Sequence, residues 1–501
     1  MELVEEVLCC LCSHCHLPLS KWMLVQYASS EQIALASLCL VSKLLRALAQ
    51  PLLFHHFQSH NGDHISKLPL FVRTIIRQPD LAAAVKWISI CTPVNPSSFP
   101  PAWPSVLNEF SMATIPEAAE RLNISQSLLL SLHEYRGGRI PDQFLRRMPF
   151  MKFWNFCEQL LLTYTPQLEQ LRIEKRRGRR ERIRDMSHFT SLGLNLSLPF
   201  LRRMTLTFTP TTPHIEPFRD FDIARFAPLL GATERLHTLE IIGARRFLGG
   251  RRTIMVPVSP SIRQQEAWCA TGLQHLKNLV FTGCCMLPLD ELAHLTQLCS
   301  SLEAIEFYPV VPRDEPVDIM RAIEPAARTL RRIRINLINA SDWRFITHGM
   351  QFYNYQPLDY RAFQNFNLLQ VLWLDQAAFR KIKFVPNILQ PDHSQCNESP
   401  ADISTPGEEP GDYSANLADI LPPFITTLFI VEVFQPSIYA DLVYLAEKTK
   451  SGSFPQLRKV YVEDGNYPLL SDQEDISNLF TKISVQVTFG KINELDYSMA
   501  H

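Results

Sequence analysis

The sequence predicts an α/β protein in which a short helical module precedes an irregular solenoid of strand-plus-helix units. Two observations lead to this prediction. One apolar residue, two variable residues and then two alternating apolar residues recur nine times between residues 168 and 462. The N-terminal segment instead spaces its apolar residues by three and four, which is typical of amphipathic helices. Each repeat cannot bury its apolar face alone, so stacked neighbours have to complete the core.

The N-terminal helices are predicted at residues 2–12 and 28–53. In the first segment, the spacing of Val4, Val7 and Leu8 forms one apolar stripe, with glutamates near the start that complement the helix dipole. Within the second segment, 28–53, we expect the helix itself to end before Pro51. Its apolar residues, among them Leu35 and Leu38, outnumber those that two short helices can hide, which implies a partner surface.

The repeats predict nine strands, each followed by a segment that returns over the outside of the sheet. Helical returns are expected at 220–230, 289–299 and 437–450, and VKWISI at 85–90 is a candidate earlier strand. The copies of the pattern begin at Leu168, Leu201, Leu236, Leu276, Leu302, Leu330, Leu369, Ile425 and Leu457. Their spacing is irregular, so a smooth horseshoe is not expected.

Three regions follow from these patterns. We expect a helical module at 1–57, a helical linker and N-terminal cap of the solenoid at 58–150, and the solenoid at 151–490. Residues 386–420 are rich in Pro, Ser, Gly and acidic residues and poor in large apolar ones, a composition typical of a disordered loop within the array.

Composition limits the class of function. The chain has 501 residues, is 46% hydrophobic and 20% charged, and carries a formal net charge of -1. This balance gives no overall electrostatic basis for binding nucleic acid or a membrane surface. The acidic start and the lack of a long apolar run favour a cytoplasmic or nuclear protein. In that setting we expect the 12 cysteines to be thiols and not disulfides.

The segment CSHCH at residues 12–16 matches the CxxCH pattern of covalently attached haem. Haem would need an attachment compartment and a second axial ligand, and neither is indicated, so we expect no haem. Zinc is the better metal alternative, because Cys9, Cys12 and Cys15 are spaced by three, with histidines at 14 and 16. No second pair of ligands follows in the sequence. We therefore favour cysteines that line the first helix and the loop after it, with no metal and no cofactor.

The basic run EKRRGRRERIR at 174–184 is interpreted as a solvated loop, with nuclear targeting as the alternative. No phosphate-binding loop, nucleophile elbow or zinc-protease motif occurs in the sequence. We therefore expect a protein without catalytic residues.

The segments ELVEEVL, ALASLCLVSKLLRALAQPLLFHHF and LFVRTIIRQPDLAAAVKWISI resemble the F-box and downstream region of fungal F-box proteins with a leucine-rich-repeat-like C-terminal half. The resemblance implies a substrate receptor of an SCF-type E3 ubiquitin ligase, in which the F-box binds the Skp adaptor and thereby a cullin. By position, the implied adaptor-binding residues are Leu3, Val4, Val7, Leu8, Leu35, Leu38, Val41, Ser42, Arg46 and Leu48. Three alternatives remain: these residues form only a small helical core, the chain is an interaction scaffold that binds no adaptor, or it is a metal or redox protein with the cysteine cluster loaded.

The repeat strands are expected to present a protein substrate with a ladder of outward side chains. Aromatic residues gather in the C-terminal half of this ladder, and exposed aromatics are enriched among binding hot spots. The predicted substrate-binding residues are Tyr308, Arg334, Trp373, Phe429 and Tyr461, with Arg334 as a polar anchor. The alternative is that the 386–420 loop or the outer helices cover these rings.

Overall fold

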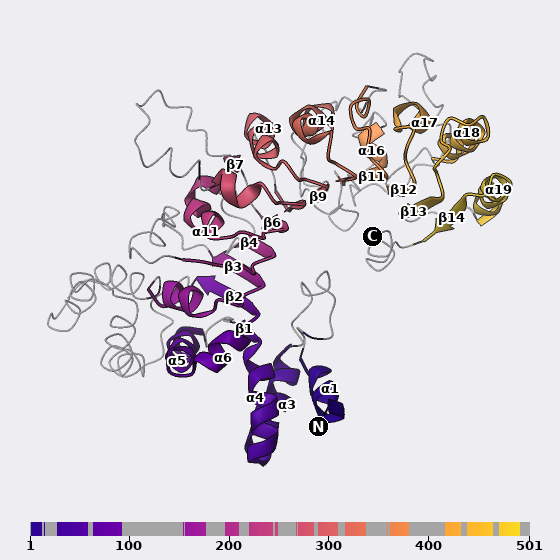
Figure 1. Cartoon of the computed structure of the whole chain (residues 1–501). Coiled ribbons are helices and arrows are strands. Elements are labelled where there is room, and N and C mark those ends of the chain that lie inside the picture. Colours follow the sequence, from indigo (N-terminus) through magenta and orange to yellow (C-terminus); the bar gives the residue numbers. More distant parts are fainter. Residues whose placement is uncertain are drawn as a thin grey trace, which may run out of the picture. The chain divides into compact units, whose positions relative to one another are not determined.

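The computed structural model describes residues 2–12, 15, 28–58, 64–92, 154, 156–176, 196–209, 220–243, 246–248, 267, 269–284, 289–308, 316–336, 358, 361–379, 416–431, 438–463 and 470–490. The chain forms two compact units. The first comprises Met1–Val280 with Leu298–Leu302, and the second comprises Phe281–Gln297 with Glu303–His501. Figure 1 shows the elements of both.

Three helices open the first unit: α1 (Glu2–Cys9), α3 (Ala28–Val41) and α4 (Lys43–Phe54). The single helix predicted at 28–53 is therefore two helices. The break falls at Ser42, whose backbone is extended and whose hydroxyl oxygen accepts a hydrogen bond from the Leu45 N–H at 3.1 Å. This hydrogen bond makes Ser42 the N-cap of α4, so a separate helix begins at Lys43. The predicted end before Pro51 is wrong, because α4 continues through Pro51 to Phe54.

The sheet of the first unit is parallel, and its strands follow one another in chain order. They are β1 (His56–Gln58), β2 (Trp87–Thr92), β3 (Gln170–Arg176), β4 (Arg203–Thr209), β6 (Thr238–Ile242) and β8 (Asn278–Thr282), of which the last two residues are assigned to the second unit. Helices α5 (His64–Arg77), α6 (Pro79–Ala84) and α11 (Ala227–Gly231) lie on one side of it (Figure 1). The register places Ile88, Leu171, Met204 and Leu239 in one buried row.

The second unit repeats this arrangement with β9 (Ala304–Tyr308), β10 (Arg332–Ile335), β11 (Val371–Asp375), β12 (Thr427–Val431), β13 (Lys459–Glu463) and β14 (Gln486–Phe489). The strands are again parallel and in chain order. The helices are α13 (Leu289–Leu298), α14 (Pro316–Ile323), α16 (Gln376–Phe379), α17 (Leu417–Ile420), α18 (Tyr439–Lys450) and α19 (Leu470–Thr481). A parallel sheet whose strand order equals the chain order is the geometry that stacked strand-plus-helix units produce.

The predicted strands are confirmed. Each of the nine repeat copies contains a strand, and VKWISI overlaps β2 of the same sheet. The first apolar residue of every copy is also buried. Each repeat therefore supplies three core positions, which explains why the pattern is so regular.

Three expectations need correction. Residues 220–230, predicted as a helix, begin with β5 (Asp220–Asp222), which pairs with β7 (Arg246–Leu248); η4 (Ile223–Phe226) and α11 follow. Strands β1 and β14, the first and last in the strand order, add to the predicted copies. The last part of the predicted disordered segment is α17, with Leu417 and Ile420 buried. Residues 386–415 of that segment lie outside the described residues.

Candidate functional site

Exposed apolar side chains concentrate on the three N-terminal helices. Nine large apolar side chains of the described residues are exposed, and six of these belong to α1, α3 and the start of α4. Their exposed fractions range from 40% for Val4 to 80% for Leu40. We call this set the docking face; it comprises Val4, Val7, Ile33, Leu40, Val41 and Leu44.

A small core lies beneath the docking face. Leu8, Leu35 and Ala49 are buried, and Leu38 and Leu48 pack against them with several other partly buried residues. Helix α3 therefore carries apolar side chains on both its inner and its outer side. A helix that is apolar all round is normally buried all round. The exposed side of α3 thus has the character of a surface that a partner covers.

The structure divides the predicted adaptor-binding residues between these two environments. Val4, Val7 and Val41 belong to the docking face, whereas Leu8, Leu35, Leu38 and Leu48 belong to the core. The side chain of Leu3 lies outside the described residues. Leu8 and Leu35 are buried and offer no surface for contact, whereas Leu38 and Leu48 are partly buried and remain accessible in part.

The two polar residues predicted at the edge both stabilise the junction between α3 and α4. Ser42 caps α4, and the Nε of Arg46 donates to the carbonyl oxygen of Cys39 at 2.9 Å. Both side chains are exposed. They hold the two helices in the orientation that presents Leu40, Val41 and Leu44.

Sequence reasoning missed three members of the docking face: Ile33, Leu40 and Leu44. A signal was present for Leu40, because it follows Ile33 by seven residues, a spacing that returns to the same side of a helix. Leu44 lies on α4, beyond the break at Ser42, so this periodicity does not extend to it. The inner stripe of Leu35 and Leu38 was equally apolar, so the pattern did not indicate which side would face outward.

The predicted substrate-binding residues do come together in the second unit. The strand register aligns Arg334 with Trp373, Trp373 with Phe429, and Phe429 with Tyr461. The rings of Trp373 and Phe429 stack with centroids 4.8 Å apart, and those of Phe429 and Tyr461 stack at 4.6 Å. The Arg334 guanidinium lies 3.4 Å from the Trp373 ring centroid and 4.1 Å from that of Tyr308. We call these five residues the aromatic row.

The middle of the aromatic row is buried. Trp373 is 3% exposed and Phe429 is 0% exposed, and both belong to one apolar cluster with Val371 and Val431. Tyr308, Arg334 and Tyr461 are half-buried. Direct contact with a substrate is therefore open to these last three, while the two buried rings support them.

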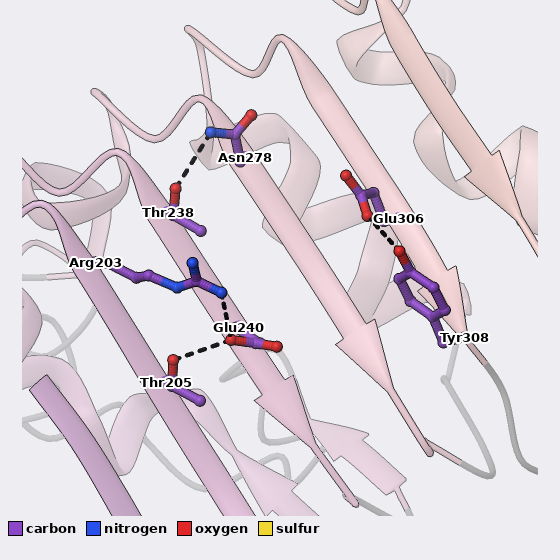
Figure 2. Close-up of polar contacts among 7 residues, drawn as sticks. All are labelled: Arg203, Thr205, Thr238, Glu240, Asn278, Glu306 and Tyr308. Atoms are coloured by element: carbon purple, nitrogen blue, oxygen red, sulfur yellow. Dashed lines mark hydrogen bonds and ion pairs between the residues drawn. The ribbon is translucent and has the colours of Figure 1, made fainter. Parts of the chain in front are cut away.

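The corresponding sheet face of the first unit is polar. Glu240, which is 3% exposed, accepts hydrogen bonds from the Nη2 of Arg203 and the hydroxyl of Thr205, both at 3.0 Å (Figure 2). The amide of Asn278 donates to the hydroxyl of Thr238 at 3.2 Å. In the second unit, the Tyr308 hydroxyl donates to Glu306 at 2.9 Å (Figure 2). These bonds connect neighbouring strands or fix side chains along one strand.

Three polar atoms on this face of the first unit are buried and have no hydrogen-bond partner among the described residues. They are Nε2 of Gln170 and Nε of Arg172 on β3, and Oγ1 of Thr207 on β4. A buried donor without an acceptor costs about 1–3 kcal/mol.

Two thiols, those of Cys12 and Cys15, lie close to the His55 imidazole near the end of α1. The Sγ atoms of Cys12 and Cys15 lie 3.7 and 3.6 Å from Nδ1 of His55, the residue that follows α4. Partial burial raises the pKa of the Cys15 thiol to about 12, and the neighbouring thiols of Cys12 and Cys9 add to this increase. Within the described residues, Cys12, Cys15 and His55 form the one group with metal-ligand spacing.

No helix in the described part of the chain has both the length and the apolar character required to cross a membrane. A search of protein-family models and a search of curated proteins found nothing that matches this chain.

Proposed function

We propose that the protein is the substrate-recognition subunit of an SCF-type E3 ubiquitin ligase. In this proposal the docking face binds the Skp adaptor, the adaptor joins the protein to a cullin, and the sheet binds a protein substrate. The observation that supports it best is the docking face itself, since six large apolar side chains stay exposed on the segments that resemble an F-box.

Covering the docking face would contribute favourable free energy to association. Fully burying a Val, Leu or Ile side chain contributes about 1.5–3 kcal/mol. The six side chains are between 40% and 80% exposed, so covering all of them would yield on the order of 5–10 kcal/mol before the costs of association. Central, well-covered members of such a patch contribute most.

The proposal assigns no chemistry to this chain. The ligase partners carry the ubiquitin, and the receptor contributes by holding the target close to it, which converts a bimolecular step into an effectively intramolecular one. On the substrate side, we propose contacts with Tyr308, Arg334 and Tyr461. Trp373 and Phe429 would act beneath them as a rigid base.

The test is co-purification of the tagged full-length chain from cell extract, read by mass spectrometry. We expect the Skp adaptor and a cullin with the natural sequence. We also expect their loss with Leu40→Asp, because a desolvated carboxylate opposes burial. Phe424→Asp is the matched control, since Phe424 is an exposed apolar residue of the second unit.

Two results would overturn the proposal. One is the absence of adaptor from the natural-sequence sample while other proteins are captured, which would favour an interaction scaffold. The other is equal adaptor recovery with Leu40→Asp and Phe424→Asp.

A further inference from the structure

Three potential metal ligands, Cys12, Cys15 and His55, converge where α1 ends and α4 ends. Cys9, Cys12 and Cys15 come from one short stretch, and His55 lies forty residues after Cys15. The ligand atoms of Cys12, Cys15 and His55 all lie within 4.8 Å of one another. The thiol of Cys15 also interacts with those of Cys12 and Cys9. The histidines at 14 and 16, the nearest candidates in sequence, lie outside the described residues.

The distances fit a tetrahedral metal site. Zinc binds thiolate sulfur at about 2.3 Å and imidazole nitrogen at about 2.0–2.1 Å. At a tetrahedral angle these bond lengths separate sulfur from nitrogen by roughly 3.6 Å. The two observed sulfur-to-nitrogen distances are 3.7 Å for Cys12 and 3.6 Å for Cys15. The side chains of Cys12, Cys15 and His55 are therefore spaced as ligands of one ion.

We propose that Cys12, Cys15 and His55 bind one structural zinc ion, with the neighbouring thiol of Cys9 moving in as the fourth ligand. Three thiolates and one imidazole are a common donor set for structural zinc, and soft sulfur ligands disfavour magnesium and calcium. All four positions are taken by protein atoms, which leaves no open coordination site for chemistry. The proposal rests on these four residues and does not depend on adaptor binding.

The site has a physical role in the fold. The core of the three N-terminal helices contains three buried side chains, Leu8, Leu35 and Ala49. A core of that size contributes little stability, and small modules often rely on a metal or disulfide staple. An ion held by Cys12 and His55 would join the end of α1 to the end of α4. Its binding free energy then becomes folding free energy of the module.

The test uses the full-length chain, expressed with zinc and purified without chelators. We expect about one zinc per chain by elemental analysis. We also expect that titration of the zinc-free protein with Co²⁺ gives the thiolate charge-transfer bands and the strong visible absorption of tetrahedral cobalt.

Two variants and one control locate the site. Cys12→Ser with Cys15→Ser, and separately His55→Ala, should weaken zinc affinity at least about tenfold in competition with a chromogenic chelator. His55→Ala keeps the backbone carbonyl that accepts from the N–H groups of Lys86 and Trp87. Cys10→Ser is the matched control, because Cys10 is exposed and sits beside Cys9. It should bind zinc like the natural sequence.

Several outcomes would overturn the inference. The first is natural-sequence protein that stays below about one zinc per ten chains after incubation with zinc. The second is a cobalt spectrum without thiolate charge-transfer bands. This measurement uses the natural sequence, so it does not depend on whether a variant folds. The third is full zinc affinity in the double cysteine variant or in His55→Ala.

Discussion

Two leucines on the same helix should separate stability from adaptor binding. Leu35 is 2% exposed and lies in the core of the helical module, whereas Leu40 is 80% exposed and lies on the docking face. Leu35→Ala removes buried apolar volume and should lower the free energy of unfolding by about 2–5 kcal/mol. Leu40→Ala removes atoms that already contact water and should change it by less than about 0.5 kcal/mol.

For adaptor affinity, Leu40→Ala should have a larger effect than Leu35→Ala. Burying the exposed part of Leu40 contributes about 1–2 kcal/mol, so its truncation should weaken binding roughly 5–30-fold. Leu368→Ala, at a residue of the second unit that is 45% exposed, should leave the affinity unchanged.

The assays are denaturant unfolding of the full-length chain, followed through the helical signal, and calorimetric titration with purified Skp adaptor. The reasoning fails if Leu40→Ala destabilises the fold as much as Leu35→Ala does. It also fails if Leu40→Ala and Leu368→Ala bind the adaptor equally well.

Three further variants test the sheet and its supports. Trp373→Ala should lower the free energy of unfolding by about 3–5 kcal/mol, because the buried ring stacks on Phe429. An unfolding midpoint in denaturant equal to that of the natural sequence would contradict this packing. Gly272→Ala should lower the melting temperature, because the new Cβ would clash with the carbonyl of Leu230. Gly452→Ala has open space around its Cβ and should lower the free energy of unfolding by only about 1 kcal/mol, because of its positive φ. Similar melting temperatures for the two variants would refute the clash. Glu240→Gln weakens two charge-assisted hydrogen bonds and should lower the free energy of unfolding in denaturant by about 1–3 kcal/mol. No measurable change would mean that these bonds do not contribute to stability.

The strands were predictable from sequence because every repeat places three residues in the core. In the copy that contains β6, Leu236, Leu239 and Ile241 are all buried, so selection for burial left a visible pattern. Strand β1 was missed because HFQ carries one apolar residue between two polar ones, and only pairing with β2 makes it a strand. Short edge strands of this kind depend on tertiary context.

The candidate site was predictable only in outline. Apolar spacing identified α3 as a helix with excess apolar surface. It could not assign Leu35 to the inside and Leu40 to the outside, because both sides of the helix are apolar. The aromatic row followed from strand alternation, but the burial of Phe429 depends on three-dimensional packing that alternation does not encode.

The approach of His55 to the cysteines was invisible in the sequence. It depends on how α4 packs against α1, over a separation of forty residues from Cys15. Ligands that come from one segment can be recognised by their spacing. A ligand from a distant helix end cannot, which is why the sequence alone favoured thiols without a metal.

Hydrogen exchange of the full-length chain, with and without purified Skp adaptor, tests the central claim most directly. If the docking face binds the adaptor, amide exchange should slow in peptides that cover α3 and the start of α4, where Ile33, Leu40, Val41 and Leu44 lie. Peptides that cover the strands of the second unit should exchange as before. Unchanged exchange across α3 and α4 at saturating adaptor would contradict the account.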